Sequence, residues 1–93
     1  MCESAIDALS LAAIEQCDMA TAYLSTGGGW GDAGRDELIR LLTRSTVLIA
    51  AVDNGLGGDL LAGRLAKLAE GAAVRFDRLR PRMKDWNQQL CEM

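Results

Sequence analysis

The chain contains no histidine, one proline and only four aromatic residues among its 93 residues. Without histidine, the commonest general base and metal ligand of proteins is missing. Hydrophobic residues make up 49% of the sequence, which is enough for one small core built mainly from aliphatic side chains. We therefore expect a single domain spanning residues 1–93. We predict that it is not an enzyme and that it binds no cofactor and no metal.

Long apolar runs and targeting signals are also missing. The longest unbroken apolar run covers residues 47–52, far less than a membrane span requires. The first seven residues carry two acids and no base, which argues against a signal peptide. The three cysteines are odd in number, lack metal-binding spacing and indicate a reducing compartment. A cytoplasmic protein is expected, in which Cys2 and Cys91 are either reactive thiols or incidental surface cysteines.

The dominant pattern is an apolar stripe that runs from Leu61 to Leu90 with steps of three and four residues, as on one face of an α-helix. Its members are Leu61, Leu65, Leu68, Ala72, Phe76, Leu79, Met83, Trp86 and Leu90. Similar spacing occurs in two earlier segments. The stripe stays in phase across Pro81, a residue that normally ends or kinks a helix.

Helix caps and glycines divide the chain into three segments of similar length. Ser4 with Asp7 is a weak capping box, and Asp32 and Asp59 are the other expected N-caps. Glycine clusters at 27–29 and 55–58 separate the segments. The predicted helices cover residues 4–25, 33–54 and 59–80. We predict an all-α fold, an antiparallel up-down-up three-helix bundle, with a C-terminal helical extension or a short fourth helix after Pro81.

The segment after Pro81 carries large apolar residues that such a bundle does not cover. Met83, Trp86 and Leu90 follow the phase of the core stripe but lie beyond the ends of the other two predicted helices. Either the chain bends at Pro81, so that Trp86 closes the bundle end beside Trp30, or a nearly continuous helix docks on a second copy or another protein.

Residues 29–34 formally match the dinucleotide fingerprint G-x-G-x-x-G. The match is set aside because a predicted helix, not a strand, precedes it, and because Asp32 would face the phosphate. Trp30 in this loop is interpreted as a lid on the bundle or as an exposed anchor for a partner.

Basic residues concentrate near the C-terminus. Residues 64–84 contain seven bases and two acids, whereas residues 1–34 contain five acids and no base. Pairing between the two regions explains this distribution without a ligand. An acidic protein partner remains an alternative. A nucleic-acid surface at Arg75–Lys84 is less favoured, because a net charge of −3 repels phosphate at long range.

These observations predict a non-enzymatic interaction module: a small regulator, inhibitor or adaptor that binds another protein through the Trp30/Trp86 end. The predicted partner-binding residues are Trp30, Arg78, Arg82, Met83, Trp86 and Leu90. The alternative is a homodimeric structural or scaffold protein with the Leu61–Leu90 stripe as its seam. Nucleic-acid binding through Arg75–Lys84 is the less favoured third hypothesis, and no membrane interaction is expected.

Overall fold

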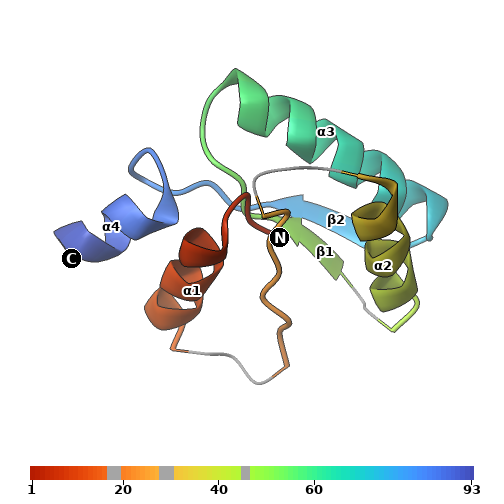
Figure 1. The fold of residues 1–93 in the computed structure, drawn as a ribbon, viewed down its shortest axis with the longest axis horizontal. Coiled ribbons are helices and arrows are strands. Elements are labelled where there is room, and N and C mark those ends of the chain that lie inside the picture. The colour runs from red at the N-terminus through yellow and green to blue at the C-terminus, as the bar shows by residue number, and fades with distance from the viewer. Residues whose placement is uncertain (17–19, 28–30, 45–46) are drawn as a thin grey trace.

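A parallel sheet runs through the middle of the computed structural model, which describes residues 1–16, 20–27, 31–44 and 47–93 (Figure 1). Strand β1 (Val47–Ala50) pairs in parallel with β2 (Arg75–Arg78), and Val47 lies opposite Arg75. Residues 1–3 extend the sheet beyond β1, because the Met1 nitrogen donates to the Ile49 carbonyl over 2.9 Å and the Met1 carbonyl accepts from Ala51 N–H.

A fourth extended segment completes the sheet. Cys2 forms a parallel bridge to Ser25 through its N–H to the Leu24 carbonyl and its carbonyl to the Thr26 N–H. The order across the described part of the sheet is therefore residues 24–26, residues 1–3, β1 and β2. The first two segments are too short to count as strands, but they continue the ladder.

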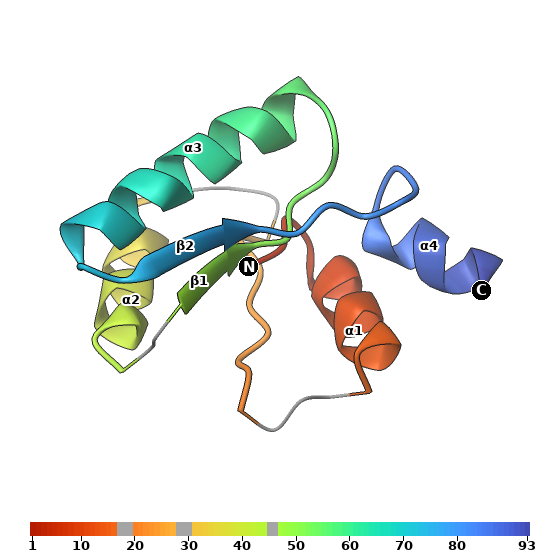
Figure 2. The same ribbon diagram turned by 180° about the vertical axis from the view of Figure 1, so that it is seen from behind.

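Helices cover both faces of the sheet (Figures 1 and 2). Helices α2 (Asp32–Leu42) and α3 (Leu56–Gly71) pack on one face, and α1 (Ala5–Ile14) and α4 (Trp86–Glu92) pack on the other. Side chains of a strand alternate between faces, so the segment after Ile49 contributes to two cores. Leu48, Ala50 and Val52 pack with α2 and α3, while Ala51 packs with Cys2, α1 and Trp86.

The predicted all-α three-helix bundle is wrong, because the protein is a mixture of helices and parallel strands. Residues 33–54 are not one helix: α2 ends at Leu42, and β1 begins at Val47. The apolar run at 47–52 lies inside this predicted helix. A short, unbroken apolar run is equally typical of a parallel strand that is covered on both faces, and the burial of Leu48, Ala50 and Ala51 shows that covering.

The predicted helix 59–80 also ends early. α3 stops at Gly71, and Ala73 takes the left-handed conformation with φ of 56°. Ala73 N–H donates to the Glu70 carbonyl and Val74 N–H to the Ala69 carbonyl, which together make a Schellman motif. Alanine occupies the position where glycine is usual. No glycine therefore marks this end of α3 in the sequence. The three- and four-residue spacing of apolar residues continues into β2 by coincidence.

The first predicted helix, 4–25, is correct at its beginning only. Ser4 is its N-cap, with the hydroxyl oxygen accepting from Asp7 N–H, as predicted. The helix ends at Ile14, followed by Gln16 in the left-handed region, and residues 21–24 are extended or irregular. The N-caps of α2 and α3 are Gly31 and Gly55 rather than Asp32 and Asp59.

The Leu61–Leu90 stripe is divided among α3, β2, a loop and α4, so it does not form a single helical seam. Of the two predicted forms of the tail, the short fourth helix is present as α4. Among the described residues, no helix combines the length and the apolar composition needed to cross a membrane.

Candidate functional site

The candidate site lies where two parallel strands end beside each other. From residues 1–3 the chain crosses through α1 to residues 24–26 on one side, and from β1 it crosses through α3 to β2 on the other. The strand order thus reverses between residues 1–3 and β1. In open parallel sheets, ligands bind in the crevice beyond the carboxyl ends of the strands at such a reversal. Glu3 and Asp53 lie at this edge.

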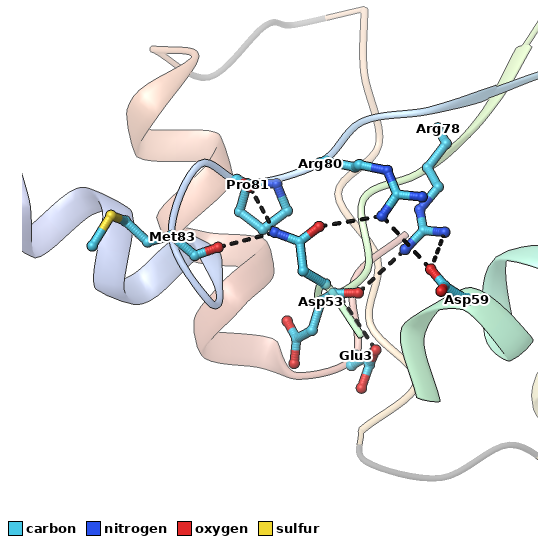
Figure 3. A network of polar contacts seen from close by, with 8 residues as sticks. Glu3, Asp53, Asp59, Arg78, Arg80, Pro81 and Met83 are labelled. Carbon is cyan, nitrogen blue, oxygen red and sulfur yellow. Dashed lines mark hydrogen bonds and ion pairs between the residues drawn. The ribbon is translucent and has the colours of Figure 1, made fainter. Parts of the chain in front are cut away.

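Glu3 and Asp53 are held next to each other by the backbone. The Asp53 N–H donates to Oε1 of Glu3 over 3.3 Å (Figure 3). The Glu3 carbonyl accepts from the Thr26 hydroxyl over 3.1 Å. Both acidic residues are half-buried. Oδ1 of Asp53 is shielded from solvent, yet it has no hydrogen-bond partner within the described structure.

The electrostatics of the site favour protonation of Asp53. The pKa of its carboxyl group is raised to about 6, chiefly by burial and then by the negative charges of Glu3, Asp7 and Asp85, with Lys84 opposing the shift. Asp7 and Asp85 already have structural roles: Asp7 accepts from Asn87 N–H over 3.2 Å, and Asp85 caps α4 through Gln88 N–H. Glu3 and Asp53 are therefore the carboxylates available to a ligand.

Glycine allows α3 to begin close to Asp53. A Cβ atom on Gly58 would lie 1.8 Å from the Asp53 carbonyl oxygen and 3.4 Å from Oε1 of Glu3. Gly55, at the N-cap of α3, has φ of 114°, which a side chain would strain. Both glycines therefore fix how the chain turns from Asp53 into the helix.

A polar network continues from this edge toward β2 (Figure 3). Arg78 donates from Nη1 to Oδ1 of Asp59 over 2.6 Å and from Nη2 to the Asp53 carbonyl over 3.3 Å. The hydrogen bond from Arg78 to Asp59 lowers the pKa of the Asp59 carboxyl group. Asn54 donates to the carbonyls of Pro81 and Met83 over 2.8 and 3.1 Å. The segment after β2 is thereby held across the same edge.

A family model described as Toprim-like matches residues 1–90. The chain belongs to the Toprim-like family. No curated protein and no solved structure matches it. Toprim-like domains occur in enzymes that act on nucleic acids, and this class of enzyme often uses Mg²⁺ held by one or two carboxylates together with substrate phosphates.

The acidic edge of this Toprim-like chain fits such an ion. Two acidic residues lie there, joined by the hydrogen bond from Asp53 N–H to Glu3, and Oδ1 of Asp53 has no partner among the described residues. In the described residues, no group of three or more Asp, Glu, Cys or His side chains is arranged to hold a metal. Glu3 and Asp53 would thus supply only part of a coordination shell, which matches the preference of Mg²⁺ for water and phosphate oxygens over a complete protein cage.

The described residues that were predicted to bind a protein partner differ in their surroundings. Trp30 falls outside the described residues. Trp86 is 3% exposed, and its Nε1 donates to the Ala51 carbonyl over 2.8 Å in the core between α1 and α4. Arg78 belongs to the network at the acidic edge, and Arg82 is exposed. Met83 and Leu90 are half-buried. Partner binding through these residues stays a prediction.

The two cysteines near the termini differ in environment. Cys2 is buried, and burial raises the pKa of its thiol to about 11, which makes it a poor nucleophile. Cys91 is exposed on α4. Cys17 lies outside the described residues.

Sequence reasoning missed Glu3 and Asp53 because it placed both outside any strand. What points to the site in the sequence is the position of these two residues next to other elements. Asp53 directly follows the apolar run 47–52, and Glu3 directly precedes the N-cap Ser4. A polar residue between a buried strand and a helix start is typical of ligand sites in parallel sheets. A helix over residues 33–54 hides this indication, because Asp53 then lies inside the helix.

Proposed function

We propose that the chain holds one divalent cation between Glu3 and Asp53 and, through it, binds and acts on the phosphodiester backbone of nucleic acid. The observation that carries this proposal is the solvent-shielded, unpartnered Oδ1 of Asp53 beside Glu3 at the point where the strand order reverses. Membership of the Toprim-like family supports nucleic acid as the substrate class. A cytoplasmic location is part of the same proposal.

Charge makes the proposed binding depend on the cation. The negative charges of Glu3 and Asp53, together with those of Asp7 and Asp85 nearby, repel a phosphate. A bound divalent cation supplies positive charge that neutralises the carboxylates and polarises a phosphoryl oxygen. The chain's own contribution is to hold the two carboxylates in place through Asp53 N–H and to keep Oδ1 of Asp53 out of water.

The pKa of Asp53 predicts how this binding varies with pH. A proton and a cation compete for the same carboxylate, and the pKa of Asp53 is about 6. We therefore expect cation-dependent nucleic-acid binding to strengthen as the pH rises from 5 toward 7.

Fluorescence anisotropy of a labelled single-stranded oligonucleotide tests the proposal. The protein is titrated with Mg²⁺ or with a chelator present, using the original chain and the variants Glu3→Gln and Asp53→Asn. The expected result is binding that requires Mg²⁺ and is lost in both variants. Glu37→Gln is the matched control, because Glu37 lies on α2 and forms a surface ion pair with Arg40. Equal binding by Asp53→Asn and Glu37→Gln contradicts the proposal.

A further inference from the structure

Arg80 lies beside the acidic edge, and the fold has little need of it. Its Nη1 is 3.6 Å from Oδ1 of Asp59, while Nη1 of Arg78 bonds the same oxygen at 2.6 Å. The Arg80 side chain is 55% exposed and that of Arg78 is 17% exposed. An exposed, long ion pair to an acceptor that is already bonded contributes little to stability. Arg78 therefore makes the structural pair, and Arg80 is left available.

Asn54 determines where the Arg80 guanidinium lies. The Asn54 amide nitrogen uses both of its N–H groups on the carbonyls of Pro81 and Met83. Its Oδ1 is left to accept from Nη1 of Arg80 over 3.3 Å (Figure 3). Asn54 directly follows Asp53 in the chain. This bond therefore ties the Arg80 guanidinium to the residue next to one of the proposed cation ligands. It occupies one of the five N–H donors of arginine, and Nη1 also makes the 3.6 Å ion pair with Oδ1 of Asp59; in the described part of the chain, Nε and Nη2 make no hydrogen bond.

We infer that Arg80 binds a phosphate of the nucleic acid next to the phosphate at the cation site, and that Asn54 positions it. This inference rests on the proposed function. A planar guanidinium with free N–H groups forms paired hydrogen bonds to phosphate oxygens. Arg78 is unsuited to this role, because its Nη groups are occupied by Asp59 and the Asp53 carbonyl. Arg80 thus selects a substrate with consecutive phosphates over a single free phosphate.

Arg82 provides a matched control for this assignment. It lies two residues further along and is exposed, and among the described residues it bonds only through its backbone N–H, to Oε1 of Gln89. Arg80→Ala and Arg82→Ala therefore change the net charge equally, but only Arg80→Ala removes a guanidinium that is held at the acidic edge. Arg80→Lys keeps the charge and loses the paired hydrogen bonds.

The experiment measures Mg²⁺-dependent oligonucleotide binding by these variants at several salt concentrations. Arg80→Ala is expected to weaken binding about tenfold to a hundredfold, as for loss of a charged hydrogen bond. It is also expected to reduce the slope of log K against log salt by about 0.7, the value for one single-strand phosphate contact. Arg82→Ala is expected to leave that slope unchanged, and Arg80→Lys to preserve the slope while weakening binding.

The positioning role of Asn54 is tested by combining variants. Asn54→Ala should weaken binding in the original chain and have no further effect in the Arg80→Ala background. Additive losses would overturn the positioning role.

The results separate this inference from the proposed function. If the original chain shows no Mg²⁺-dependent binding, both are wrong. If it binds with Mg²⁺ and Arg80→Ala behaves like Arg82→Ala, the assignment of Arg80 is wrong while the proposed function stands.

Discussion

The backbone N–H of Asp53 donates a hydrogen bond to Oε1 of Glu3 over 3.3 Å, although the two residues are 50 positions apart in the chain. Each follows a neighbouring parallel segment of the sheet, so the fold brings both carboxylates to one edge. Burial and the negative charge of Glu3 both disfavour the ionised form of Asp53 and raise its pKa. The arrangement is therefore strained electrostatically until a proton or a cation is bound.

The pH dependence of stability tests this strain. The pKa of Asp53 is raised from 3.8 to about 6 in the folded chain, so the folded state binds the proton more tightly than the unfolded state. The stabilisation is fully present below pH 3.8 and is lost as the pH rises through about 6. With a chelator present, urea unfolding should show a loss of roughly 1–2 kcal/mol across this window, allowing for partial solvent screening.

Asn at position 53 mimics the protonated carboxyl group. Asp53→Asn should remove this part of the pH dependence and raise the free energy of unfolding at pH 7. Asp77→Asn is the control, because Asp77 makes an exposed ion pair with Arg75. An unchanged pH profile in Asp53→Asn would show that this carboxyl group does not titrate abnormally.

Two adjacent glycines of α3 should respond oppositely to alanine. At Gly58 a Cβ would lie 1.8 Å from the Asp53 carbonyl, so Gly58→Ala should destabilise the fold by about 1–3 kcal/mol through forced backbone shifts. At Gly57 no atom lies within 4 Å, and Gly57→Ala should stabilise it by about 0.5–1 kcal/mol. Thermal unfolding of both variants, compared with that of the original chain, measures these two changes in stability. The same sign at both positions would contradict the close approach.

Trp86 should behave as a core residue. Trp86→Phe leaves the Ala51 carbonyl without the Nε1 donor, which costs about 1–3 kcal/mol for an unsatisfied buried group. Glu92→Ala, on the exposed end of α4, should change stability by less than about 0.5 kcal/mol. Urea unfolding followed by circular dichroism compares them. If Trp86 were an exposed anchor, both variants would be equally stable.

Replacing Ala73 at the end of α3 by glycine should stabilise the fold. Ala73 has φ of 56°, a conformation that costs an L-residue about 1 kcal/mol. Ala73→Gly should therefore raise the free energy of unfolding by up to about 1 kcal/mol. Ala66→Gly, inside α3, should lower it by about 0.5–1 kcal/mol. Calorimetric unfolding that shows loss in both variants would contradict the left-handed assignment.

The sequence carried enough information for some elements of this fold. Ser4 with Asp7 located the start of α1, because an N-cap is a local hydrogen bond that depends on neighbouring residues alone. A short fourth helix after Pro81 was among the predicted forms of the tail, and α4 is present. These signals are local, and the structure confirms them.

Other elements depended on contacts between distant residues. The run 47–52 suits a buried helix and a buried parallel strand equally, and only its coverage by helices on both faces decides between them. Ala73 ended α3 without a glycine signal, so the helical spacing continued into Phe76. The pairing of Glu3 with Asp53 follows from strand order, which neither residue reveals in sequence.

Titration calorimetry of Mg²⁺ or Mn²⁺ into the original chain and into Asp53→Asn, at pH 7.5 and at pH 5, measures whether Glu3 and Asp53 hold a cation. We expect one cation per chain, weaker binding at pH 5 because protons compete for Asp53, and no binding by Asp53→Asn. A cation affinity that is the same at both pH values and in Asp53→Asn would contradict the assignment of this edge as the functional site.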